Sequence, residues 1–125
     1  MLRTIGGVVV GFIVWAIAVT VLNIGLRHGM AGYAAVEKSM AFTVPMMAAR
    51  LSISGVGSVL SGAAAARVGR GLLAAVIAGV VLLLCFIPVH YGLWHRFPIW
   101  YHLTFLTSLV VLSIVGGLIT RPRAS

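Results

Sequence analysis

Residues 72–89 read LLAAVIAGVVLLLCFIPV and contain no charged side chain. A helix needs about 17–25 apolar residues to cross the hydrocarbon core of a bilayer, and this run has that length. Lipid offers the backbone no hydrogen-bond partners, so an apolar segment that spans it has to be helical. The stretch therefore predicts a transmembrane helix.

Three further apolar runs of this kind cover residues 4–26, 46–66 and 103–120, and the short segments between them hold nearly every charge. Hydrophobic residues make up 62% of the 125 positions and charged residues only 8%, whereas a soluble domain has about 25% charged residues. We therefore predict an all-α membrane protein: one antiparallel four-transmembrane-helix bundle that forms a single domain over residues 1–125.

The charge pattern excludes several classes of function. The sequence contains nine Lys and Arg residues and a single acid, Glu37. The basic residues lie singly at the ends of the apolar runs, where they orient helices and contact lipid headgroups. No basic stripe typical of a nucleic-acid binder is present. A single carboxylate rules out a paired acid–base mechanism within one subunit, and no nucleophile-elbow or zinc-protease motif occurs. We predict no catalytic residue and no enzymatic activity.

The distribution of basic residues also indicates an orientation. With four spans, both termini lie on the same side, which holds five basic residues: Arg3, Arg67, Arg70, Arg121 and Arg123. The opposite side holds four: Arg27, Lys38, Arg50 and Arg96. Short cytoplasmic connections carry the excess of Lys and Arg. We therefore expect a multi-pass protein with both termini in the cytoplasm.

The second run is the richest in small residues and is the expected packing centre. Ser54, Ser58 and Gly62 repeat every four residues and so lie on one helix face, as do Gly7 and Gly11 in the first run. Small residues four apart let two membrane helices approach closely. We predict that the helix over residues 46–66 contacts at least two of the others.

The expected outer side carries most of the polar chemistry, concentrated in residues 90–102, which are rich in Trp, Tyr, Phe and His. One interpretation is an aromatic belt at the membrane interface. A second is a haem or metal site with His90, His95 and His102 as candidate ligands, although their spacing matches no zinc pattern. A third is a pocket for a quinone or lipid headgroup. We favour the aromatic belt and therefore predict no bound metal or cofactor. The haem or metal site and the headgroup pocket stay open as alternatives.

Six residues on this side are candidate contacts for a ligand or partner. They are Arg50, Glu37, Trp94, Arg96, Trp100 and Tyr101. Arg50 lies about one turn inside an apolar run, where charges often mark functional sites. Extension of its side chain to the headgroups, or pairing with Glu37, explains it equally well.

Residues 97–105, FPIWYHLTF, resemble a segment of small bacterial four-helix membrane proteins of uncharacterised function. The resemblance implies a bacterial inner (plasma) membrane and four helices, and it implies no function. In size the chain is also similar to the small multidrug resistance transporters, but residues 4–26 lack the carboxylate that those proteins use for proton coupling.

The expected function follows from the absence of recognisable chemistry and from the small-residue faces. We predict a non-catalytic accessory or scaffold subunit that associates with the lipid bilayer and with its own copies or a larger membrane complex. A small oligomeric transporter or channel is the alternative. A haem-, metal- or quinone-binding protein with its site at the outer face is the second alternative.

Overall fold

The computed structural model describes residues 2–30, 32–33, 42–92, 94–95 and 97–120. Over these residues it has four long helices and no strand: α1 (Leu2–Gly29), α3 (Val44–Gly69), α4 (Leu72–Gly92) and α5 (Ile99–Thr120). All four are long and apolar enough to cross a membrane. The chain is therefore a multi-pass membrane protein, and the predicted all-α fold with four transmembrane helices is confirmed.

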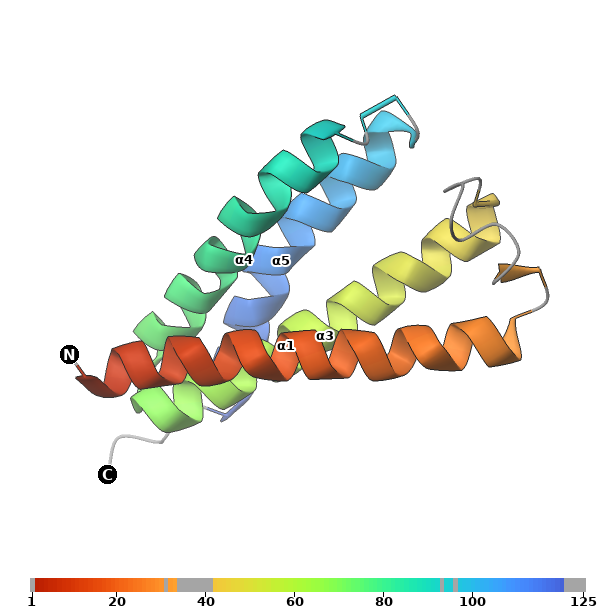
Figure 1. Cartoon of the computed structure of the whole chain (residues 1–125). Helices are drawn as coiled ribbons and strands as arrows, with labels where there is room; N and C mark the ends of the chain where they lie inside the picture. Colours follow the sequence, from red (N-terminus) through yellow and green to blue (C-terminus); the bar gives the residue numbers. More distant parts are fainter. Residues whose placement is uncertain (1, 31, 34–41, 93, 96, 121–125) are drawn as a thin grey trace.

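Successive helices run in opposite directions, so both termini lie at the same end of the bundle (Figure 1). α1 and α3 form one hairpin, and α4 and α5 form the other. The two hairpins cross near the termini and diverge toward the opposite end, which we call the distal end (Figure 1). α3 contacts all three other helices, and the prediction that this helix is the packing centre is confirmed.

The helices extend beyond the apolar runs that predicted them. α1 begins at Leu2 instead of residue 4 and ends at Gly29 instead of residue 26. The largest difference is in α5, which begins at Ile99 instead of residue 103. The prediction treated the aromatic residues after Pro98 as part of a connection. They form the first turn of the helix instead, because a helix can continue through the polar interface beyond the hydrocarbon core.

Local signals mark both ends of α3. The hydroxyl of Thr43 accepts a hydrogen bond from the Met46 backbone N–H at 3.4 Å, and Pro45 occupies the first turn, where its missing N–H costs no hydrogen bond. At the other end Arg70 adopts a left-handed conformation (φ 56°), and its N–H donates to the Ala66 carbonyl. The backbone conformation of Arg70 and its hydrogen bond to Ala66 therefore form the turn that follows α3.

Pro88 does not end α4, which continues to Gly92. Proline deprives one carbonyl of its helical partner, but membrane helices tolerate this because neighbouring helices and local adjustments compensate. The extra turn carries His90 into the helix and turns its side chain into the bundle, where it is 5% exposed.

Close backbone contacts hold the helices together near the termini. A Cβ added to Gly62 of α3 would overlap the Ser113 carbonyl of α5, and one added to Gly116 would overlap the Val59 carbonyl. Gly7 of α1 packs directly on α3, with an added Cβ 2.5 Å from the Ala65 oxygen. The small-residue faces predicted from the sequence are therefore the helix contacts.

Side-chain size increases along the bundle, and this explains the divergence. Near the termini the buried cluster consists of alanines: Ala65, Ala74 and Ala78. The middle cluster contains Trp15, Leu82, Phe105 and Leu109, and the distal cluster contains Tyr33, Phe42, Met46, Met47, Phe97 and Tyr101. Small side chains let backbones approach closely and large ones hold them apart, so the helices separate toward the distal end.

Candidate functional site

A hydrogen-bonded network around Arg50 joins three segments at the distal end. Arg50 Nε donates to the Tyr101 hydroxyl at 3.1 Å and Nη1 donates to the Tyr33 hydroxyl at 2.8 Å. The Tyr33 hydroxyl donates in turn to Asn23 Oδ1 at 2.8 Å. The guanidinium carbon lies 4.6 Å from the centroid of the Phe42 ring, a cation–π distance. The network links α1, α3 and α5 through one cationic side chain.

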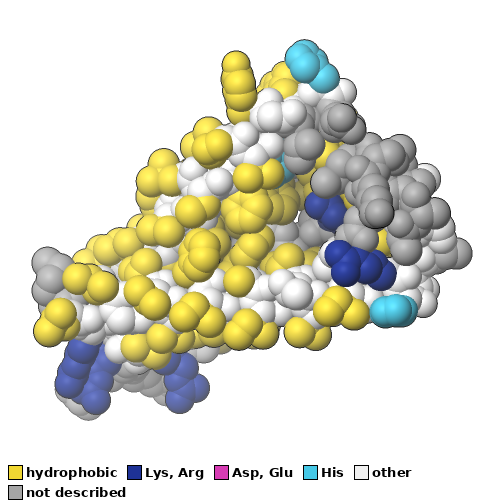
Figure 2. Space-filling model, viewed as in Figure 1, with side chains coloured by type: hydrophobic (Ala, Val, Ile, Leu, Met, Phe, Trp, Pro, Cys, Tyr) yellow, Lys and Arg dark blue, Asp and Glu magenta, His cyan; other side chains and the backbone are white. Residues whose placement is uncertain are grey.

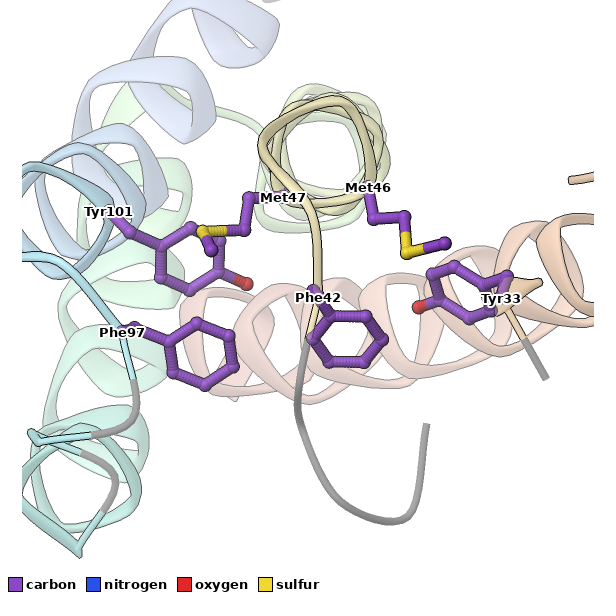
Figure 3. Close-up of a cluster of buried hydrophobic side chains, with 6 residues drawn as sticks. All are labelled: Tyr33, Phe42, Met46, Met47, Phe97 and Tyr101. Carbon is purple, nitrogen blue, oxygen red and sulfur yellow. The ribbon is translucent and has the colours of Figure 1, made fainter. Parts of the chain in front are cut away.

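Large apolar side chains enclose this network. Figure 3 shows the hydroxyls of Tyr33 and Tyr101 pointing toward the middle of the distal cluster, with the Phe42 ring between Tyr33 and Phe97. Tyr33 is 0% exposed and Tyr101 is 2% exposed. Phe97 stacks on Tyr101 with ring centroids 4.6 Å apart. The arginine is half-buried and is held by aromatic partners within the protein, and the predicted extension of its side chain to the headgroups stays a prediction.

The partners of Arg50 among the described residues carry no negative charge. Tyrosine hydroxyls are neutral, so they satisfy N–H donors without supplying negative charge. Glu37, the only acid in the sequence, lies outside the described residues, and its predicted pairing with Arg50 stays a prediction. A charge removed from water is unfavourable unless it is paired with a counter-charge, and the described partners of Arg50 supply hydrogen bonds only.

A histidine pair joins the end of α4 to the start of α5. His90 Nδ1 and His102 Nδ1 are 2.6 Å apart, and His102 Nε2 lies 3.3 Å from the Trp94 carbonyl oxygen. A carbonyl only accepts, so His102 Nε2 carries a proton in this contact. A neutral His102 then accepts at Nδ1, and His90 donates from its own Nδ1.

Aromatic contacts fix the histidine pair. The Trp94 indole stacks on the His102 imidazole at 4.8 Å and 12°, and His90 lies 4.6 Å from the Phe105 ring and 6.1 Å from the Tyr101 ring. His90 therefore supports the aromatic side chains that surround Arg50. These contacts hold the end of α4 against the start of α5. A chain of hydrogen bonds runs from His90 through His102 to the Trp94 carbonyl.

The three candidate histidines do not converge. His95 is exposed, and no three His, Cys, Asp or Glu side chains within the described part of the chain could hold a metal ion. Metal–imidazole bonds are about 2 Å long, so two axial ligands of one iron would stand about 4 Å apart. His90 and His102 are in direct contact at 2.6 Å, and this arrangement does not bracket a haem iron.

A cavity of about 340 Å³ opens beside the Arg50 network, between the diverging hairpins. α1 lines it with Trp15, Val19, Thr20, Asn23, Ile24 and Arg27, α3 with Arg50, Ile53 and Ser54, and α4 and α5 with Phe86, Tyr101 and Phe105. Figure 2 shows Lys and Arg side chains in and beside a hollow at this end, and a separate basic group near the termini. The volume of the cavity is in the range of known ligand pockets.

The cavity has a polar end and an apolar end. Arg27 and Arg50 lie at the distal end, whereas Trp15 and Phe105 lie deeper in the bundle. Trp15 is fixed there because its Nε1 donates to Ser58 Oγ at 3.3 Å. Twelve positions separate Trp15 from Arg27 on α1, or about 18 Å at 1.5 Å per residue. The cavity thus runs along the helices, from the interface toward the middle of the bilayer.

Ser54 is a buried polar group on the cavity wall. It is 1% exposed, and among the described residues its Oγ has no hydrogen-bond partner. Most hydroxyls in membrane helices bond to their own backbone or to a neighbouring helix. A buried polar atom without a partner calls for an explanation, and a ligand in the cavity is one.

The predicted contact residues are distributed unevenly around this site. Arg50 and Tyr101 line the cavity, whereas Trp94 stacks on His102 and is not among the lining residues. Trp100 is 44% exposed and contacts Tyr101 at 6.2 Å. Arg96 and Glu37 lie outside the described residues.

Sequence reasoning missed Trp15, Asn23, Ser54 and Phe105 as site residues. Of these, only Asn23 carried a signal, as a polar residue within an apolar run. The others are ordinary membrane residues in type, and only the meeting of four helices makes them neighbours.

Comparison of the chain with models of protein families, with curated proteins and with solved structures finds no match.

Proposed function

We propose that this protein is a non-catalytic accessory protein of a bacterial plasma membrane and that it binds an amphipathic molecule in the distal cavity. The cavity carries the proposal, because it combines two arginines and several hydrogen-bonding groups at one end with aromatic walls at the other. Few polar groups converging in a mostly apolar cavity are typical of ligand sites. Ligand binding at the outer face is thus the first proposed function, and a role as a scaffold subunit is the second.

The location in the bilayer is part of this proposal. Both termini would lie in the cytoplasm, and the cavity would open in the outer half of the membrane. Short basic connections at the termini end support this orientation. A fluorescent C-terminal GFP fusion and an inactive C-terminal alkaline phosphatase fusion are expected; the reverse pattern would place the cavity in the inner leaflet.

Quenching of Trp15 tests ligand binding directly, because this side chain lines the cavity and is 7% exposed. With Trp94 and Trp100 replaced by Phe, Trp15 becomes the sole indole. Addition of ω-bromododecanoate or ω-bromododecanol to the protein in nanodiscs of a zwitterionic lipid should then quench its fluorescence saturably.

Two variants of α1 make the quenching test specific. Thr20→Phe fills the cavity from its wall and should abolish saturable quenching. Val21→Phe adds a ring at the next position, which is 62% exposed and outside the cavity lining, and should leave quenching intact. Equal, non-saturating quenching in both variants and the parent would contradict ligand binding at this site.

A second function, as a scaffold subunit, has its own observation. An open groove of about 500 Å³ runs between α3 and α5, with Val56, Val59, Leu60 and Leu112 among its lining residues. It fits an apolar helix of a larger complex. If a partner helix occupies the groove, Val56→Trp should abolish co-purification of that partner in mild detergent. Val111 is 49% exposed and lies outside the groove lining, so Val111→Trp should retain the partner.

An oligomeric transporter or channel has less support. The serine face of α3, a polar surface that could line a path, is packed inside the bundle, with Ser58 and Ser61 at 0% exposure. Flux of any solute from a broad panel in proteoliposomes would restore this function to first place.

A further inference from the structure

The polar end of the distal cavity has more positive charge than this chain can neutralise. Arg27 and Arg50 both line it, and Glu37 is the only Asp or Glu in the whole sequence. Even if Glu37 pairs with one guanidinium, the other has no side-chain carboxylate available. Arg27 is exposed and Arg50 is half-buried, and attraction between charges is stronger beside a half-buried group than in bulk water, so a counter-anion from outside the chain would be bound favourably.

The hydrogen-bonding groups at this end are those that suit an anionic head. A guanidinium has five N–H donors, and the contacts to Tyr33 and Tyr101 do not exhaust them. Ser54 lies one helical turn after Arg50 on α3, lines the same cavity, and has a buried Oγ without a partner among the described residues. Arg50 and Ser54 thus line one volume, and arginine is the side chain best suited to carboxylate and phosphate oxygens.

The direction of the cavity specifies the rest of the ligand. From the two arginines it runs about 18 Å along α1 to Trp15, past Val19, Ile53 and Phe105. The hydrocarbon of one leaflet is about 15 Å thick. A lipid-like molecule that stands in a leaflet with its head at the interface has the same polarity profile.

We infer that the ligand is an anionic amphiphile, with a single carboxylate or phosphate head held by Arg50 and Ser54 and an apolar tail against Trp15, Ile53 and Phe105. The inference rests on the proposed ligand-binding function and adds the sign of the head group. It separates this ligand class from neutral quinones and from small soluble anions.

The matched bromo-probes test the inference on the protein without a pocket variant. They share one tail and differ in the head, and at a pH well above the pKa of the acid, ω-bromododecanoate is an anion while ω-bromododecanol is neutral. A charge-assisted hydrogen bond in a buried site is worth enough to make the anion bind about 10-fold or more tightly. Equal affinities would refute the anionic head while leaving ligand binding established, whereas failure of both probes would refute the proposed function itself.

Variants locate the effect. Arg50→Gln should remove most of the preference for the anion, and Arg50→Lys should retain part of it, because charge persists without the planar fork. Ser54→Ala should weaken binding of the anion about 3- to 10-fold. Arg67→Gln, an exposed arginine near the termini, is the charge-matched control and should leave both affinities unchanged. An anion preference that survives in Arg50→Gln would overturn the assignment of the head site.

Competition distinguishes the sources of the anion. Decylubiquinone, acetate and inorganic phosphate are added separately to protein loaded with ω-bromododecanoate. None should displace the probe at concentrations where unbrominated dodecanoate does. Displacement by acetate or phosphate would instead identify a site for soluble anions, and tighter binding of decylubiquinone would identify a quinone site; either result would overturn the inference.

Discussion

Gly62→Ala should break the contact between α3 and α5 at its closest point. The added Cβ would overlap the carbonyl of Ser113 and lie 2.5 Å from its carbonyl carbon, whereas ordinary carbon contacts begin at about 3.5 Å. Both partners are helical backbone, which cannot rotate away as a flexible side chain does. The helices must therefore move apart by about 1 Å, the difference between these distances.

The cost of this movement follows from what the contact contains. Overpacking of this kind costs about 1–3 kcal/mol. The separation also stretches two hydrogen bonds between α3 and α5, from Ser113 Oγ to the Ser58 carbonyl at 3.3 Å and from Thr120 Oγ1 to the Ala63 carbonyl at 3.2 Å, worth about 0.6 kcal/mol each in membranes. Alanine returns about 0.5–1 kcal/mol of backbone entropy in a helix. The expected net loss of unfolding free energy is about 1–4 kcal/mol.

Titration with SDS from a mild detergent, followed by Trp fluorescence and circular dichroism, measures this loss. Gly25→Ala is the matched control, because an added Cβ at Gly25 meets nothing within 4 Å; this variant should be neutral or more stable by up to about 1 kcal/mol. If Gly62→Ala unfolds at the same SDS fraction as Gly25→Ala, the close crossing of α3 and α5 is not a feature of the folded protein.

Three further predictions use the same titration. Ser58→Ala leaves the buried Trp15 indole N–H without its acceptor and should cost about 0.6–1.7 kcal/mol; no change would mean that water replaces the hydroxyl. Tyr33→Phe removes the hydroxyl that links the guanidinium to α1 and should cost about 1–2 kcal/mol, and a neutral effect would argue against the network. A double-mutant cycle of His90→Ala and His102→Ala should give a coupling of about 0.5–3 kcal/mol, and additive losses would contradict their 2.6 Å contact.

The helices and their membrane setting could be predicted from sequence because one property, a long apolar run, is enough. The bilayer excludes alternatives to helix for such a run. The helix ends were less predictable. The aromatic residues between Pro98 and Leu103 and the turn after Pro88 belong to helices, although their composition is that of an interface.

The candidate site could be predicted only in part. Charge in an apolar run singled out Arg50, and interfacial chemistry singled out Tyr101, His90 and His102. The sequence interpretation grouped the histidines as ligands, whereas two of them pair with each other and His95 stays exposed. Pairing depends on which residues of α4 and α5 face each other across their connection, and spacing along the chain does not define that.

By itself, the sequence determined the class of the protein, the number of spans in the described chain and the small-residue faces, because these depend on composition and helical periodicity alone. The cavity was decided by the tertiary structure. Glycines and alanines bring the helices together near the termini, and Trp15, Phe86, Tyr101 and Phe105 hold them apart toward the distal end. The residues that line the resulting space come from four helices, so no local pattern in the sequence marks them as neighbours.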